Sequence, residues 1–384
     1  MVAIAILLSV YLALILANPF IIIFHELGHA VGYLLLSKSQ KVEVFIGSYG
    51  DKNTKFKFSL GKLDFYIKPT LSLKAVGQCC SYSTDTNYIN EIIILLAGPF
   101  ASILVCVLVG PIIFNSDVHG SIKLFCFALT IWSFISLIIN LNPRATKVTG
   151  IDNDGKQLWF TFKIRRFYAE YIAAHQAFGN GRYSVSAEKY RLLHMQFPDE
   201  IRFYRPLIDS LMPLKNIEEA ECLFIELEKY TIFNSRDYLQ LAYIYSVTER
   251  HELAIKNNRI ALSLDANNVL VLNNLAYELS LNGSYLEAEQ LLNRAIAINP
   301  ELADLYSTLG LLKIMTGNLE DGKMLIDKSL EIDGSNAYAF KHLGIYYLKK
   351  LNREMAISNF NKALELDPTI RIDAFVRECE FLVD

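Results

Sequence analysis

The sequence predicts a mainly α-helical protein, in which a polytopic membrane helical core with a small β-sheet segment precedes an α-solenoid of helix pairs. Three observations carry this prediction. Residues 1–142 contain three apolar runs long enough to cross a membrane. Between the first two runs, residues 42–67 alternate apolar and polar side chains as short strands do. From about residue 167 onward, the chain repeats with a period of 34 residues.

The composition and charge exclude some classes of function. The 384-residue chain is 52% hydrophobic, and the excess lies before residue 143. Its net charge of −3 offers no basic surface, so no nucleic-acid partner is expected. The six cysteines form no Cys-x-x-Cys pair, so they predict neither a zinc ribbon nor a disulfide framework.

The predicted membrane spans are about 2–37, 92–115 and 123–141. As one helix the first run would extend about 54 Å, well beyond a hydrocarbon core of about 30 Å. A single long helix, kinked or tilted near Pro19, is favoured, and two spans with a reversal at Asn18-Pro19 are the alternative.

Lysine and arginine residues predict the orientation. Eight lysines lie in the loop 38–89, and six basic residues lie in the segment 144–166 after the last span. Three spans put both segments on one side, which the positive-inside rule makes cytoplasmic. We therefore expect a multi-pass integral protein of the cell or inner membrane, surrounded by the lipid bilayer. Its parts are a membrane domain (1–157), a linker (158–166) and a cytoplasmic solenoid (167–384).

A candidate metal site lies inside the first apolar run, in His25-Glu26-Leu27-Gly28-His29. His25 and His29 are one helical turn apart, so both imidazoles can bind one metal ion, and Glu26 can reach a water on that metal. Ionisable groups are costly within a bilayer, which favours a functional interpretation. The alternative is a helix end whose polar side chains lie in cytosolic water.

A third ligand is needed, because a catalytic zinc usually takes three protein ligands and one water. The other histidines lie on the predicted outer side or in the soluble part, so a carboxylate is expected. Asp152 and Asp154, just after the last span, are the candidates.

The membrane half resembles the site-2 protease family of intramembrane zinc metallopeptidases. The matching motifs are His25-Glu26-x-x-His29, Gly98-Pro99, and Asn140-x-x-Pro143 followed by Asp154-Gly155. The resemblance implies that His25, His29 and Asp154 bind Zn²⁺. Asp152 stays a rival ligand, because the gap after Pro143 is longer than is usual in the family.

The same resemblance implies an activity, the hydrolysis of a peptide bond in or near a transmembrane segment of a membrane protein (regulated intramembrane proteolysis). Glu26 would be the catalytic general base. Asn140 would position the substrate backbone or the oxyanion, although a helix C-terminal cap is an equal alternative for it. The β segment at 42–67 would pair with the substrate as an added strand.

The repeating half resembles the tetratricopeptide repeat, in which small residues let two antiparallel helices pack closely. One small-residue position recurs as Ser186, Ala220, Ala254, Ala288, Gly322 and Ala356, and a second as Ala261, Ala295, Ser329 and Ala363. Residues 369–384 are expected to form a capping helix. Such arrays present a concave face to a protein or peptide; the alternative is an array that only stabilises or oligomerises the membrane domain.

Together these features predict a zinc-dependent membrane metalloendopeptidase whose cytoplasmic repeats dock a substrate or regulator. The alternative is a non-catalytic, membrane-anchored repeat scaffold or assembly factor with a vestigial metal site. A metal enzyme of another kind on the same core is a further rival.

Overall fold

The computed structural model describes residues 2–38, 41–54, 56–69, 76–81, 86–143, 152–372 and 375–377. The chain divides into two compact units, residues 1–197 and residues 198–384, which are described separately.

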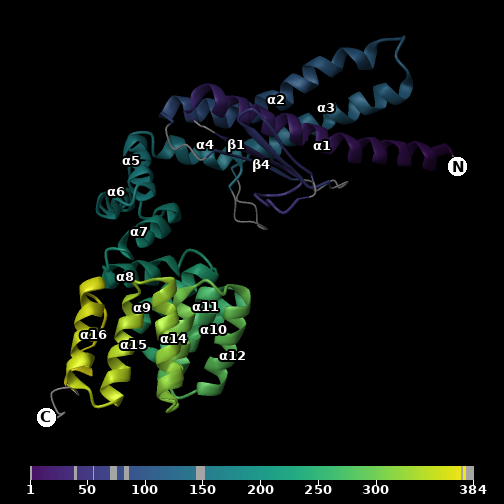
Figure 1. The fold of residues 1–384 in the computed structure, drawn as a ribbon. Coiled ribbons are helices and arrows are strands. Elements are labelled where there is room, and N and C mark those ends of the chain that lie inside the picture. The colour runs from purple at the N-terminus through teal and green to yellow at the C-terminus, as the bar shows by residue number, and fades with distance from the viewer. Residues whose placement is uncertain are drawn as a thin grey trace. The chain divides into compact units, whose positions relative to one another are not determined.

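Three long helices form the core of the first unit (Figure 1). They are α1 (Val2–Leu36), α2 (Tyr88–Phe114) and α3 (Gly120–Leu141), and each is long and apolar enough to cross a membrane. Helix α1 is continuous, with Pro19 inside it, so the alternative reversal at Asn18-Pro19 is absent. The helices pack through an apolar cluster made of Ala13, Ala17, Ile21, Val105, Ala128 and Leu129.

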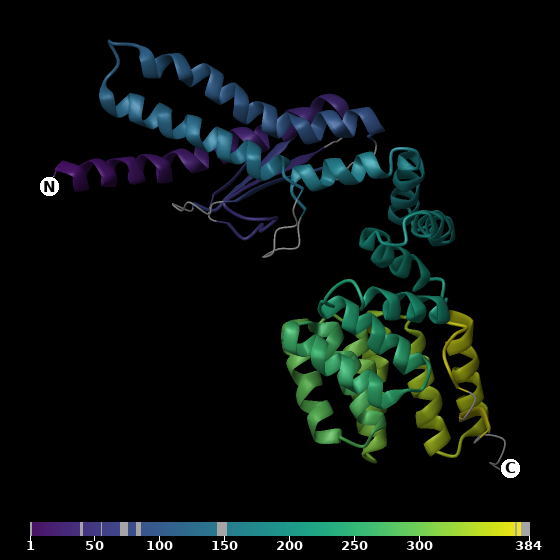
Figure 2. The same cartoon turned by 180° about the vertical axis from the view of Figure 1, so that it is seen from behind.

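A four-stranded sheet lies on one side of these helices (Figures 1 and 2). Its strands are β1 (Val42–Ile46), β2 (Phe56–Leu60), β3 (Leu63–Ile67) and β4 (Gly77–Ser81), in the order β2-β3-β1-β4. Strands β1 and β3 are parallel, and the other two pairs are antiparallel. The sheet packs on α1 through an apolar cluster that includes Ala30, Val42, Val44, Ile46 and Phe65.

Strand β4 was not predicted. Its sequence, Gly-Gln-Cys-Cys-Ser, contains no β-branched residue and no clear apolar alternation, so it lacks the local signal of a strand. Pairing with the buried strand β1 places it there.

The predicted linker 158–166 is largely helical. Helix α4 (Asp154–Lys163) includes its first six residues. The segment contains no glycine or proline to end the helix, and Leu158, Phe160 and Ile164 are buried. Two further helices, α5 (Tyr168–Gly179) and α6 (Tyr183–Gln196), complete this unit.

The second unit is a solenoid of antiparallel helix pairs (Figure 2). It begins with the short 3-10 helix Ile201–Phe203 and then contains α7 (Tyr204–Leu211), α8 (Ile217–Leu227), α9 (Ser235–Val247), α10 (His251–Leu264), α11 (Val269–Leu281), α12 (Tyr285–Ile298), α13 (Ala303–Met315), α14 (Leu319–Ile332), α15 (Ala337–Lys349) and α16 (Arg353–Leu366). The alanines of the repeat are fully buried, as close packing requires: Ala220, Ala254, Ala261, Ala288, Ala295, Ala356 and Ala363.

The predicted capping helix (369–384) falls mostly outside the described residues. Residues 375–377 are helical, whereas residues 369–372 are not. The chain after α16 therefore leaves the helical path before any cap begins.

Phe360 provides a test of solenoid packing, because its side chain is 0% exposed within the cluster around α15 and α16. Phe360→Ala should lower the free energy of local opening of these helices by about 3–5 kcal/mol, through lost burial and a residual cavity. Amide hydrogen exchange of the detergent-solubilised chain measures this. The control is Met324→Ala, since Met324 is 64% exposed. Equal effects of the two variants would contradict the packing.

Candidate metal centre

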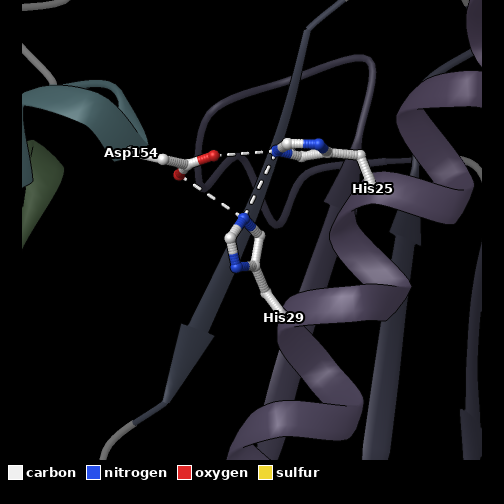
Figure 3. Close-up of side chains that lie close together, drawn as sticks. All are labelled: His25, His29 and Asp154. Carbon is white, nitrogen blue, oxygen red and sulfur yellow. Dashed lines mark hydrogen bonds and ion pairs between the residues drawn. The ribbon is translucent and has the colours of Figure 1, made fainter. Parts of the chain in front are cut away.

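The side chains of His25 and His29 on α1 converge, with their Nε2 atoms facing each other (Figure 3). Their Nε2 atoms lie 3.3 Å apart, because residues four apart on a helix share a face. Both rings are nearly buried, with His25 5% exposed and His29 6% exposed. An apolar helix therefore carries a converging pair of nitrogen ligands.

Asp154 approaches the pair from α4 (Figure 3). Its Oδ2 lies 3.0 Å from His25 Nε2, and its Oδ1 lies 3.4 Å from His29 Nε2. Burial alone would raise the pKa of this carboxyl, but its contacts with His25 and His29 outweigh burial and lower the pKa. One ligand atom from each of the three residues lies within 4.8 Å of the others. These side chains are thus able to hold one metal ion.

The other carboxylate candidate is not brought to this cluster. Asp152 lines the same cavity, but its Oδ1 forms an ion pair with Lys156 Nζ at 2.7 Å, within one helical turn. The geometry therefore favours Asp154 over Asp152.

Asn153 fixes the position of Asp154, a role that the sequence alone did not indicate. Its Oδ1 accepts a hydrogen bond from the Lys156 backbone N–H, which caps α4. Its Nδ2 donates to the carbonyls of Ile139 and Asn142, at 2.7 and 2.6 Å. One side chain thus joins the end of α3 to the start of α4. An Asx residue directly before a helix is the signal from which this cap can be predicted.

Close contacts on the far side of each imidazole orient the ring. His25 Nδ1 lies 3.2 Å from Ser102 Oγ, and His29 Nδ1 lies 2.7 Å from the Ile94 carbonyl, both on α2. Partners of this kind fix the tautomer and direct the other nitrogen toward a metal. Gly98 lies against His29, where a Cβ would come within 2.3 Å of Nε2, so only glycine fits there without displacing the ring.

Glu26 and Asn140 complete the wall of a cavity of about 750 Å³. Glu26 is 7% exposed and lines this cavity with both histidines. Asn140 Nδ2 lies 3.3 Å from His25 Nε2 and donates to Ser136 Oγ. The residue that caps α3 is Asn142, so Asn140 does not have the alternative role of a helix cap.

The chain has recognisable relatives. The family model of the tetratricopeptide repeat matches residues 270–302 and 340–370. Human protein O-mannosyl-transferase TMTC3 is 32% identical over 123 residues, which are 32% of this chain and 13% of that protein. Rat mitochondrial import receptor subunit TOM70 is 33% identical over 81 residues, which are 21% of this chain and 13% of that protein.

A longer, weaker match is anaphase-promoting complex subunit 3 of Schizosaccharomyces pombe, 20% identical over 48% of this chain and 28% of that protein. The chain thus spans only a small part of these relatives. Among solved structures, the Thermus thermophilus repeat protein TTC0263 is 20% identical, with a TM-score of 0.39 over 47% of this chain and 98% of that one. MamA from Desulfovibrio magneticus is 21% identical, with a TM-score of 0.34 over 44% of this chain and 96% of that one.

The family match coincides with α11, α12, α15 and α16, whose small residues recur every 34 positions. The chain therefore contains tetratricopeptide repeats.

Proposed function

We propose that the chain is an intramembrane zinc metalloprotease with a tetratricopeptide-repeat docking domain. One observation carries the proposal: Asp154, which is 129 positions after His25 in sequence, meets the His25–His29 pair of α1 in a cavity that Glu26 also lines. The comparisons concern tetratricopeptide-repeat proteins and give no support for proteolysis. The enzymatic part of the proposal therefore rests on this geometry and on the motif.

The spacing of the ligand atoms supports zinc. Zn–N and Zn–O bonds of about 2.1 Å in a tetrahedron put neighbouring ligand atoms about 3.4 Å apart. Here the two Nε2 atoms lie 3.3 Å apart, and each lies near a different oxygen of Asp154, His25 Nε2 at 3.0 Å from Oδ2 and His29 Nε2 at 3.4 Å from Oδ1. Two imidazoles and a carboxylate leave a fourth position for water or substrate, as in catalytic zinc sites.

The residues of this chain then have distinct roles in peptide hydrolysis. Bound zinc would supply Lewis acidity for the scissile carbonyl and for the attacking water. Glu26 accepts the proton of that water at its carboxylate and donates it to the departing amine. Asn140 Nδ2, beside the ligand cluster, is placed to donate to the carbonyl oxygen as negative charge develops on it.

Strand β4 is suited to hold the substrate. It lies at the edge of the sheet, and its residues Gly77, Gln78 and Cys79 line the cavity that contains Glu26. A transmembrane substrate must unwind locally to expose its backbone, and an added strand satisfies the freed amide groups. Strand addition to β4 would present a peptide bond next to the metal site.

The remaining parts of the proposal concern location and partners. Three helices long and apolar enough to cross a membrane support a multi-pass protein of the cell or inner membrane. The lysine and arginine residues of segments 38–89 and 144–166 predict that the solenoid is cytoplasmic. There it would bind a substrate or regulator, as a protein or peptide.

A second candidate function is a membrane-anchored scaffold that assembles other proteins through the solenoid. Its support is specific: the family match is to repeats alone, and TOM70 is an import receptor subunit. The scaffold would need neither Glu26 nor zinc, so the first experiment below separates the two functions, and the next two test the proposed metal site.

Glu26→Gln should keep one equivalent of bound zinc and lower hydrolysis by about 10²–10⁴-fold, because it removes only the general base. Metal analysis of both purified proteins, and mass spectrometry of membrane proteins in matched cells, measure the two effects. Accumulation of an uncleaved membrane protein with the variant supports the protease. A purified wild-type protein without zinc would favour the scaffold. So would the same set of membrane proteins, with the same cleavage products, in cells with wild type and in cells with the variant.

Asp154→Ala should abolish stoichiometric zinc binding, because it removes a ligand, whereas Asp152→Ala should keep it. Asp152 is a matched control, since it lines the same cavity and pairs with Lys156. Zinc titration with a competing chelator provides the affinities. The reverse outcome would reassign the third ligand.

Gly98→Ala should weaken zinc binding about 10–100-fold, because the new Cβ displaces His29. Gly110→Ala on the same helix is the control, since nothing lies within 4 Å of its Cβ position. The chelator titration applies here too, and equal affinities in the two variants would argue against a metal at this place.

A further inference from the structure

The solenoid contains a second cavity, of about 490 Å³, far from the metal ligands in sequence. The first helices of successive pairs form one side of it, through residues such as Val247 of α9, Tyr277 of α11 and Lys341 of α15. Its other side is formed by the segment after α16, which contributes Thr369, Arg371, Ile372, Phe375 and Arg377. We name the described residues 367–372 and 375–377 the tail.

The tail is packed against the inner helices. Ile370 is 6% exposed and Ile372 is 4% exposed, and both belong to the apolar cluster that contains Leu311 and Ile345. Phe375 stacks on Phe360 of α16, with ring centroids 5.8 Å apart. Two β-branched residues thus fill an apolar surface that the repeats themselves provide.

An ion pair holds the start of the tail to the beginning of the unit. Asp367 Oδ2 lies 3.2 Å from Lys215 Nζ, which belongs to the loop between α7 and α8. Lys215 Nζ also donates to Tyr243 Oη at 2.8 Å. Residues 152 positions apart are therefore joined, so the tail crosses from the last helix pair to the first.

Buried apolar residues and an exposed basic residue alternate along positions 370–372 of the tail. Arg371 is exposed between the two buried isoleucines, and it lines the cavity together with Glu249. On the opposite wall, Lys341 Nζ donates to Tyr277 Oη at 3.3 Å, and burial lowers the pKa of Lys341 to about 8. This part of the tail therefore has two buried apolar residues with an exposed basic one between them.

We propose that the tail is an intramolecular occupant of a peptide-binding surface on the solenoid. A partner binds there through an extended segment of the same apolar-basic-apolar chemistry, and it must displace Ile370 and Ile372 to do so. This inference goes beyond the proposed protease or scaffold function and holds for either. It assigns both the docking surface and the contact that restricts access to it.

Tail occupancy has a measurable consequence. A ligand that binds only the open form has its affinity reduced by the fraction of molecules that are open. A peptide of residues 367–377 added in trans should therefore bind wild type weakly, and it should bind tightly once the chain's own tail is released.

The experiment uses the full-length chain in detergent and a fluorescein-labelled peptide of residues 367–377, with binding followed by fluorescence anisotropy. The chain variant Ile370→Asp/Ile372→Asp should bind this peptide at least about tenfold more tightly than wild type does, because its own tail no longer competes. A peptide with the same two substitutions should not bind. Lys215→Ala, which loses the ion pair to Asp367 and the hydrogen bond to Tyr243 but leaves both isoleucines in place, should shift the affinity in the same direction by a smaller factor.

The control chain is Met324→Asp/Leu351→Asp, which makes the same change at side chains that are 64% and 73% exposed. It should bind the peptide as wild type does. Far-UV circular dichroism reports folding, and Lys215→Ala decides the question if the isoleucine variant is unfolded. Equal affinities of wild type and a folded released variant, or no binding to that variant, would overturn the proposal.

Discussion

Burial of His25, Glu26 and His29 within α1 puts three polar side chains where water cannot freely solvate them. Unpaired polar groups in such surroundings cost several kcal/mol each by general estimates, so the neighbouring elements must supply partners. For the two histidines they do so from different directions, with α2 contacting both Nδ1 atoms and Asp154 contacting both Nε2 atoms. Helices α2 and α4 therefore both reach this turn of α1 and contact its histidines.

The segment after α3 therefore has to come back to α1. Which of its carboxylates contacts the histidines could not be predicted from the sequence alone. Two aspartates, Asp152 and Asp154, stand two residues apart, and neither composition nor spacing separates them. The hydrogen bonds of Asn153 to the end of α3 and the start of α4 decide which carboxylate faces the histidines. A local cap is recognisable in sequence, whereas its bonds to another helix depend on the tertiary structure.

A similar contrast separates the parts of the fold that could and could not be predicted. The histidine pair follows from helical periodicity, and the helix pairs follow from a 34-residue period, because both depend on neighbours close in sequence. Strand β4 and the helical continuation of α4 through 158–163 lacked such signals. Strand β4 is held by pairing with β1, which follows α1 in the chain. Its distance from β1 in sequence explains why no local pattern shows it.

The contacts of the tail are a feature of the solenoid that its regular repeat does not predict. Each repeat contacts its neighbours, so a period predicts stacking but not contacts between its first and last members. The pair between Lys215 and Asp367 is of the second kind, and it puts Ile370 and Ile372 on the surface shared by the inner helices. A solenoid without a tail on this surface can bind a partner's peptide segment at any time. One that carries its own occupant binds only a competitor, so docking becomes conditional on displacing the tail.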